Sequence, residues 1–430
     1  MKRTLVVSLV LSLAGVAGCS TDSVVATEPA ATERNPVLDW AAIVQPAVHN
    51  AVEPRAPANS EVLHAIVHLA VYDAVVAIEG GYQPYGPAVK ARDGADLGAA
   101  VATAAYRAAL GRVAPSQFAY LDGEYTRYLA GIADGKAKAD GIAVGEAAAS
   151  GILARRAGDG FDRAVSYQCG AAPPPAGEFE PDGGCGTQTV SAGLPQVRPF
   201  TFDDPVRFRP DGPDPSTSDR WVEDFDEVKA YGRKDSSVRT PEQTDVAYFW
   251  SEHAYVHWNR NLSKLAAARD LSAPETARLF AMVHTSGADA LLAGMEAKYF
   301  YSTWRPRTAV PRAVEDGNPR TAPDAGWTPL LSVNHPEYPS AHGFFSTAVT
   351  DAVAAFFGTD EVQWTIETNK EAVPQLVRTQ RSYASLQAVE DEIADARVWA
   401  GLHYRNSMDE GSELGRRVAE HVLTGWFRPT

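Results

Sequence analysis

The sequence predicts an all-helical bundle, and three observations support this fold class. Apolar residues between positions 63 and 78 recur at intervals of three and four, which is the period of a helix. Two capping boxes, Thr-Pro-Glu-Gln at 240–243 and Ser-Ala-Pro-Glu at 272–275, precede further apolar segments. No run of alternating apolar and polar residues indicates a strand. We therefore expect packed helices without a sheet in the core.

The expected helices follow one another along the first half of the chain. The segment 63–78 has one apolar face, and the alanine-rich segments 96–113 and 137–157 have high helix propensity. From residue 169 to residue 215 the chain is dense in proline, glycine and aspartate. This composition predicts a long ordered loop between the two halves of the chain.

Helical signals resume in the second half. The capping boxes predict one helix that passes through Phe249 and Trp250 and another that runs to about Lys298. An apolar helix containing residues 344–357 should end at Gly358, since glycine readily adopts the left-handed backbone that closes a helix. No apolar stretch after the N-terminus is expected to span a bilayer.

The N-terminus has the pattern of an export signal. Lys2 and Arg3 precede a short apolar segment that ends in Val-Ala-Gly before Cys19, and the segment is too short to span a membrane. This end resembles a bacterial lipobox, which implies a lipoprotein signal peptide over residues 1–18 and lipidation of Cys19. The alternative is an ordinary secretory signal followed by a chance cysteine. Either signal predicts export from the cytoplasm, and the lipobox adds a lipid anchor to the cell envelope.

The remaining chain divides into a tether and one domain. Residues 19–35 are polar and rich in alanine and threonine, which predicts a flexible tether that carries the lipid. Residues 36–430 are then a single helical domain, and its motif-bearing core lies at about 240–425. Membrane contact is expected through the lipid anchor only.

Charge and cysteine content restrict the partners and the compartment. The formal net charge is −15 and no run of lysine and arginine opposes it, which argues against a nucleic-acid partner. Cys169 and Cys185 lie close together in the glycine- and proline-rich loop. In an oxidising compartment they predict a disulfide, and two free structural thiols are the alternative.

The last third of the chain contains two candidate anion-binding segments. Lys298 and Arg305 are seven residues apart, about two helical turns, so both cations can face one point. Pro339 breaks the preceding structure, and Ser340 suits an N-cap directly before a helix. The free N–H groups of that first turn make a ready anion site.

A third segment adds another cation and a histidine. Arg397 and His403 are six residues apart and do not share a face of one ideal helix. Either their side chains converge from different angles, or the helix ends at Gly401. Each signal alone has an ordinary explanation, as a solvated face, a cap or a core histidine. Together, three cations, a hydroxyl, a helix N-terminus and two histidines, His342 and His403, match the needs of a tetrahedral oxyanion.

These segments resemble a signature shared by vanadium-dependent haloperoxidases and the type 2 phosphatidic acid phosphatase superfamily. The signature reads Lys-x6-Arg-Pro, then Pro-Ser-Gly-His, then Ser-Arg-x5-His-x3-Asp. Further segments resemble the bacterial haloperoxidase-like branch: 68–74, 239–250, 288–290, 301–306 and 335–338. The resemblance covers most of the chain after the tether. It implies a helical bundle of the vanadium haloperoxidase and acid phosphatase type.

The resemblance also implies a vanadate cofactor and a role for each matching residue. His342 would be the acid–base group, and His403 the axial ligand to the metal. His335 and Trp304 are expected to line the pocket, and histidine at position 335 is similar to bromide-preferring members. Five residues would hold the vanadate oxygens: Lys298, Arg305, Ser340, Ala341 and Arg397.

The sequence departs from the signature at three positions. Ala341 replaces glycine, which keeps the N–H but adds a methyl group near the anion, and Ala396 replaces a serine outside the direct contacts. Ser407 replaces the aspartate that orients the last histidine, so a carboxylate is lost behind the metal ligand. Asp409, Glu410 or a backbone carbonyl are the candidates to substitute for it.

Three functions compete for this site. The first is a peroxidase that uses hydrogen peroxide to oxidise halide, bromide by preference, to hypohalous acid. The second is an exported acid phosphatase with His403 as nucleophile, acting on a small phosphate ester. The third is a non-catalytic oxyanion-binding protein. The branch resemblance favours the peroxidase, and Ser407 should weaken a histidine nucleophile.

The other histidines and one aspartate of these helices are expected to have mainly structural roles. His64 and His68 have the i, i+4 spacing of a metal pair but lie among apolar residues, so a core role is expected. His253 and His257 are expected to pack or to form the pocket wall. Asp289, on the same expected helix as Lys298, either pairs with a cation or has a structural or surface position.

Overall fold

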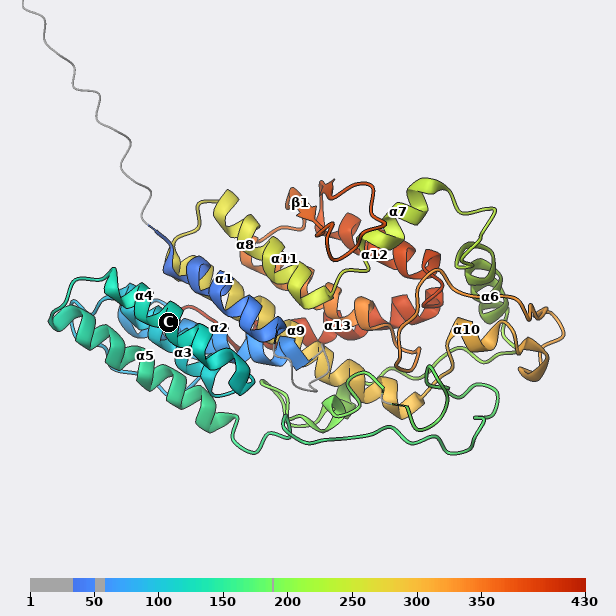
Figure 1. The fold of residues 1–430 in the computed structure, drawn as a ribbon, viewed down its shortest axis with the longest axis horizontal. Helices are drawn as coiled ribbons and strands as arrows, with labels where there is room; N and C mark the ends of the chain where they lie inside the picture. The colour runs from blue at the N-terminus through green and yellow to red at the C-terminus, as the bar shows by residue number, and fades with distance from the viewer. Residues whose placement is uncertain (1–33, 51–58, 188) are drawn as a thin grey trace, which may run out of the picture. The chain divides into compact units, whose positions relative to one another are not determined.

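The longest helix, α9 (Ala273–Tyr301), is central to the fold (Figure 1). It begins at the capping box of Ser272 and Glu275, whose side chains bond to each other's backbone N–H groups. Nearly every residue between Thr276 and Lys298 is buried, because helices pack on all sides of α9. Its last residue is Tyr301, three residues beyond the predicted end at Lys298, and the left-handed backbone of Ser302 caps it.

The computed structural model describes residues 34–50, 59–187 and 189–430. The predicted signal peptide, Cys19 and nearly all of the predicted tether lie outside these residues. Residues 35–430 form one compact unit, and its helices confirm the all-helical class. The other α-helices are α1 (Pro36–His49), α2 (Asn59–Glu79), α3 (Leu97–Leu110), α4 (Phe118–Ala130), α5 (Lys136–Arg155), α6 (Asp219–Tyr231), α7 (Pro241–Phe249), α8 (Ala254–Ala268), α10 (Pro306–Ala309), α11 (Ala341–Phe357), α12 (Leu386–Trp399) and α13 (Arg405–Gly425). Short 3-10 turns are η1 (Pro115–Gln117), η2 (Leu194–Gln196), η3 (Pro205–Phe208) and η4 (Ala313–Glu315).

Helices α2, α11 and α13 pack directly against α9. The contact between α11 and α13 is close because glycines face backbone there. A Cβ atom added to Gly415 would lie 2.3 Å from the carbonyl oxygen of Phe344, and one added to Gly343 would lie 2.9 Å from that of Met408. The start of α11 is thereby fixed against the start of α13, which places Ser340 beside Ser407.

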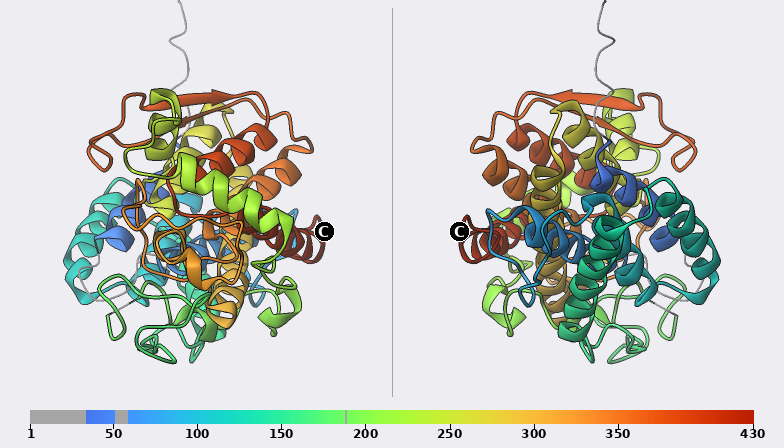
Figure 2. Two further views of the ribbon diagram at one scale, coloured as in Figure 1. Left: turned by 90° about the vertical axis from the view of Figure 1, so that its right-hand side faces the viewer. Right: turned by 90° about the vertical axis from the view of Figure 1, so that its left-hand side faces the viewer.

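Helices α3, α4 and α5 lie together at one end of the unit (Figures 1 and 2). Within it, α2 is buried almost all round rather than on one face, so the prediction of a single apolar face was wrong. By length and composition α2 could also cross a membrane, against our expectation of no such segment. However, 89% of its apolar window is buried inside the protein, as for a core helix.

A two-stranded antiparallel hairpin, β1 (Trp364–Glu367) with β2 (Gln380–Tyr383), was not predicted. Its strands have four residues each, too few for a clear alternation, and a long loop separates them. Figure 2 shows the hairpin along one edge of the unit, beyond the helices. It does not alter the helical core.

The loop between α5 and α6 is ordered, as predicted, and crosses the C-terminal end of α9. Phe179 N–H donates to the carbonyl of Ser302, and Trp304 N–H donates to that of Gly177. A disulfide joins Cys169 to Cys185 within the loop, the pair that the sequence indicated. Asp289 of α9 is buried and accepts the N–H groups of Phe200 and Thr201, so its role is to hold this loop and not to pair with Lys298.

Candidate active site

The candidate active site lies where four elements meet: the end of α9, the loop before α11, the start of α11, and the turn between α12 and α13. Gly401 in this turn has a φ of +74° and separates the two helices. A Cβ there would lie 2.5 Å from the carbonyl oxygen of Gly232, so the close approach also requires glycine. Of the two alternatives for Arg397 and His403, the helix therefore ends between them.

Lys298 is fully buried at the last turn of α9. Its Nζ donates to the carbonyls of Pro336 (3.0 Å), Glu337 (2.8 Å) and Pro339. These bonds fix the loop that leads into α11, so the cation lies directly beneath the candidate anion site. Burial, and then the neighbouring charge of Arg305, hold the pKa of Lys298 well below its usual value.

Arg305 connects this loop to the turn that carries His403. Its guanidinium donates to the carbonyls of His335, Pro336 and Leu402, the last at 2.8 Å. A further N–H lies 2.9 Å from Nδ1 of His335. Burial lowers the pKa of Arg305 to about 9, although Glu337 opposes the shift.

Arg397, at the end of α12, has an incomplete set of partners. It donates to the carbonyl of Trp250 at 3.2 Å, and its buried Nε has no hydrogen-bond partner. Burial lowers its pKa to about 9, with Arg305 as the second cause. An unpartnered guanidinium N–H at a cavity is well placed to meet an anion.

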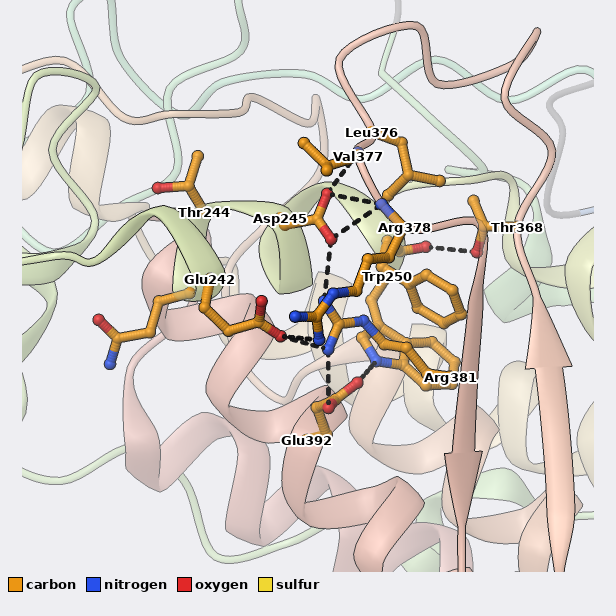
Figure 3. A network of polar contacts seen from close by, with 12 residues as sticks. Glu242, Thr244, Asp245, Trp250, Thr368, Leu376, Val377, Arg378, Arg381 and Glu392 are labelled. Atoms are coloured by element: carbon orange, nitrogen blue, oxygen red, sulfur yellow. Dashed lines mark hydrogen bonds and ion pairs between the residues drawn. The ribbon is translucent and has the colours of Figure 1, made fainter.

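A polar network fixes Trp250, and thereby Arg397 (Figure 3). The indole N–H of Trp250 donates to Glu392 of α12 at 2.9 Å. Arg381 of β2 forms ion pairs with Glu392 and with two carboxylates of α7, Glu242 and Asp245. The network ties α7, the hairpin and α12 together around the end of α12.

The start of α11 provides the helix N-terminus that the sequence predicted. Ser340 is fully buried, and its hydroxyl accepts the N–H of Gly343 at 3.4 Å, as an N-cap does. Its own N–H donates to the carbonyl of Ser407 at 2.9 Å. The first amide groups of a helix lack intrahelical acceptors, so Ala341 and His342 begin a turn that favours anions.

His403 is held by a carboxylate that sequence reasoning missed. Its Nδ1 lies 2.7 Å from Oε1 of Glu337, and the hydroxyl of Ser407 lies 3.4 Å from the same nitrogen. Neither Asp409 nor Glu410 takes this place, and Asp409 pairs with Arg220. Glu337 stands in the His-Pro-Glu-Tyr segment already identified, so a carboxylate there was the available signal.

The contact with Glu337 defines the state of His403. With Nδ1–H donated to the carboxylate, Nε2 is the ring nitrogen that keeps its lone pair for a ligand. Burial and the three surrounding cations keep the pKa of His403 well below its usual value, so the ring is neutral. Burial also raises the pKa of Glu337 to about 7, while Lys298 and Arg305 act in the opposite direction.

These groups border a cavity of about 300 Å³, here called the anion cavity. Its walls include several site residues that the sequence indicated: His335, Ala341, His342, Arg397 and His403. Lys298, Arg305 and Ser340 are buried behind this wall. Burial, followed by the charge of Arg397, lowers the pKa of His342, so this ring is neutral and able to accept a proton.

Trp304 and the remaining histidines are placed differently. Trp304 lies in another cavity, next to Trp221 and Tyr404, so the prediction that it lines the anion pocket was wrong. The left-handed backbone of Ser302 ends α9 before this residue, and Thr303 then pairs with Glu178 of the α5–α6 loop. His253 belongs to the wall of the anion cavity, and His257 is buried against Thr368.

The buried charges of the site do not balance. Lys298, Arg305 and Arg397 are at most 3% exposed. Among the described residues, two buried carboxylates lie at the site: Glu337 contacts His403, and Glu252, in the wall of the anion cavity, is already paired with Arg260. Burying uncompensated charge is costly, so an anion that entered the cavity would stabilise the site. The arrangement therefore suits a multiply charged oxyanion.

Comparison with known proteins agrees with this geometry. Residues 278–427 match the model of the VCPO second helical-bundle domain. This segment contains Lys298, Arg305, the start of α11 and the turn with His403. The chain has a vanadium haloperoxidase-like fold. No curated protein matches the sequence.

Solved structures share the vanadium haloperoxidase-like fold at low sequence identity. A crystal structure described as the first bacterial vanadium-dependent iodoperoxidase has a TM-score of 0.77 at 19% identity, covering 94% of this chain and 98% of that one. A bacterial vanadium-dependent chloroperoxidase in its apo form has a TM-score of 0.66 at 18% identity, covering 84% and 91%. Its holo form has the same TM-score and identity, covering 92% and 93%.

The residues present fit vanadate. The unpartnered Nε of Arg397, the excess of buried positive charge and the helix N-terminus at Ser340 all favour a tetrahedral oxyanion. The free Nε2 of His403 supplies a neutral nitrogen ligand of the kind that transition metals accept. Arg397 and Ala341 line the cavity and would hold the oxygens. Lys298, Arg305 and Ser340, predicted to do the same, lie outside the cavity lining, and the three N–H donors of Lys298 already bond to carbonyls, so these residues would support the site from behind.

Proposed function

We propose that this protein is a vanadate-dependent peroxidase that oxidises halide with hydrogen peroxide. The observation that carries the proposal is the anion cavity, whose wall contains Arg397, a buried arginine with an unpartnered Nε, and His403, a neutral histidine oriented by Glu337. The similar folds of proteins described as iodoperoxidase and chloroperoxidase support it. When bound, vanadate would activate hydrogen peroxide toward attack by halide, which yields hypohalous acid.

The chain's own residues would divide the work. Glu337 holds His403 in the tautomer that presents Nε2, and the three cations offset the negative charge of the anion. His342 is neutral at the start of α11 and would accept or return a proton as peroxide binds. His335, a further neutral histidine of the cavity wall, is held by Arg305.

A paired assay tests the proposal. The protein is incubated with orthovanadate, hydrogen peroxide, bromide and a phenolic dye, and in parallel with a chromogenic phosphate ester. We expect bromination that depends on vanadate, without ester hydrolysis. Hydrolysis without bromination would favour the phosphatase, and silence in both assays would favour a non-catalytic anion-binding protein.

The acid phosphatase deserves this parallel assay because of Glu337. From the sequence we expected His403 to be a weak nucleophile, because Ser407 replaces the aspartate of the signature. Glu337 provides a carboxylate to His403 in place of that aspartate. The residue at position 407 therefore does not favour the peroxidase over the phosphatase.

We further propose that bromide is oxidised in preference to chloride, since His335 belongs to the wall of the anion cavity. Initial rates with the two halides, in the native protein and in His335→Phe, test this proposal. Efficient chloride oxidation by the native protein, unchanged in the variant, would refute it.

We also propose that Cys19 carries a lipid that holds the exported domain at the cell envelope. The polar segment between Cys19 and α1 supports the proposal as a tether. Labelling of cells with a fatty-acid probe should mark the native protein and not Cys19→Ser. Equal labelling of both would contradict the anchor.

A further inference from the structure

A second cavity, of about 270 Å³, lies behind the histidine of the active site and is here called the rear cavity. Glu337 and Ser407, which contact His403 from behind, belong to its wall. In the described part of the chain, no residue lines both cavities. The proposed peroxidase chemistry makes no use of the rear cavity.

One wall of the rear cavity is aromatic. It is formed by Trp221, Trp304, Tyr338 and Tyr404. The rings of Trp221 and Tyr404 are in contact, with centroids 4.8 Å apart, and both belong to a small separate hydrophobic core together with Trp304. This core holds the rings in place from α6, α10 and the start of α13.

The other lining residues include carboxylates, two of which lack a cation. Asp224 accepts the N–H of Asn406 at 2.7 Å, and Asp316 accepts the N–H of Asn318 at 2.7 Å. In the described ranges neither forms a salt bridge, whereas Asp214 lies 3.5 Å from Arg220. The lining therefore carries two carboxylates whose charge no salt bridge of the described residues compensates, although Arg220 acts on Asp224 from a greater distance.

Three buried polar groups of the aromatic wall have no partner. The indole N–H of Trp221 and the hydroxyls of Tyr338 and Tyr404 make no hydrogen bond in the described chain, and their residues are 8%, 1% and 4% exposed. Buried polar groups in native proteins are nearly always hydrogen-bonded. The two hydroxyl oxygens can accept hydrogen bonds, so they indicate a ligand that carries N–H donors.

We propose that the rear cavity binds a small organic ammonium ion with an aromatic or apolar body. The carboxylates of Asp224 and Asp316 would compensate its charge, and the faces of Trp221 and Trp304 would attract the cation and cover the body. A bare metal ion fits less well, since no group of three or more histidine, cysteine or acidic residues in the described chain is arranged to hold one.

Calorimetric titration tests the proposal with benzylamine, which is a cation at neutral pH, and with neutral benzyl alcohol. We expect one benzylammonium ion per chain, bound about tenfold or more tightly than the alcohol, since hydrogen bonds to charged groups exceed neutral ones. Equal binding of benzylamine and benzyl alcohol, or no binding of benzylamine, would overturn the proposal. Displacement of bound benzylamine by added calcium ion would also overturn it, because the site would then be a metal site. No vanadate or peroxide is added, so the result does not depend on the proposed peroxidase.

Two matched variants locate the site on α6. Asp224→Asn keeps an acceptor for Asn406 N–H and removes the charge, so benzylamine should bind about tenfold more weakly. Asp226→Asn makes the same change at an exposed position two residues away and should bind like the native protein. Equal affinity of the two variants would overturn the assignment.

Should Asp224→Asn fail to fold, as judged by its thermal melt, Asp316→Asn tests the same charge. Trp221→Phe gives a further measurement, since it replaces the indole face with the smaller face of a phenyl ring, which attracts a cation less strongly. Its affinity for benzylamine should fall, and its fluorescence should lose the change that benzylamine causes in the native protein. An unchanged affinity in both variants would place the ion elsewhere.

Discussion

The two halves of α9 bury ionisable groups in opposite ways. Near its C-terminal end, the ammonium group of Lys298 is surrounded by three carbonyl groups, and Arg305 and Arg397 lie close by. Near its middle, His284 stacks on His68 with centroids 4.5 Å apart and faces Glu61 at 3.0 Å. Burial lowers the pKa of His284 to about 3 and raises that of Glu61, so this cluster is neutral. The neutral cluster has no net charge for a ligand to compensate, whereas the buried cations do.

The largest effect is expected from the histidine at the charged end. His403→Ala should abolish tight vanadate binding and peroxidase activity, since Nε2 of His403 is the ring nitrogen that Glu337 orients toward a ligand. His342→Ala should still bind vanadate but turn over about 10²–10⁴-fold more slowly, the usual contribution of general acid–base catalysis. Calorimetry with vanadate and bromide oxidation measure both. Equal loss of binding in the two variants would contradict these roles.

Glu337→Gln should have the next largest effect. The amide keeps the size of the side chain but no longer supports His403 as a carboxylate, and such changes cost about 10–100-fold in metal affinity. Vanadate titration measures the loss. Glu410→Gln is the matched control, because Glu410 does not contact His403, and its affinity should stay at the native value.

Arg397→Met tests the charge imbalance itself. Without anion, the variant should melt at a higher temperature than the native protein, because a buried uncompensated charge is gone. Vanadate at about 100 times its Kd should stabilise the native protein by about 2.7 kcal/mol and the variant by much less. Melting curves with and without vanadate provide all four values. If vanadate does not raise the melting temperature of the native protein, the buried cations do not need an anion and the contrast with the neutral cluster fails.

The smallest effect is expected at the neutral cluster. His68 is buried, and burial, followed by its histidine neighbours His284 and His64, holds its pKa well below 6.5, although Asn259 opposes the shift. The unfolded chain binds a proton as pH falls below 6.5 and the folded one does not, so this residue costs about 2 kcal/mol of stability between pH 7 and 5.

His68→Leu should therefore lose less stability than the native protein over this interval. Urea unfolding at pH 7 and pH 5 measures the difference, with His421→Leu as a control on a partly exposed histidine. Parallel losses in the native protein and in His68→Leu would show that the cluster takes up protons while folded.

Local signals were strong enough to predict much of the fold. The capping boxes at Thr240 and Ser272 and the glycine at 358 mark ends of α7, α9 and α11 within a few residues, because these features act over one turn of chain. The helix α2 was identified, but not its burial on every side, since neighbours from α3, α5 and α9 decide that. The hairpin was not predicted because its two short strands are stabilised by pairing with each other, and neither strand has a clear alternation of apolar and polar residues.

By itself, the sequence determined the helical class and the order of the three anion-binding segments. Only the tertiary structure decided which carboxylate supports His403, because Glu337 and His403 are 66 residues apart and meet through the packing of α11 on α13. The tertiary structure also places Trp304 in the rear cavity and not in the anion cavity. Side-chain direction and burial depend on contacts between distant segments, and those contacts also created the charge imbalance on which the proposed function rests.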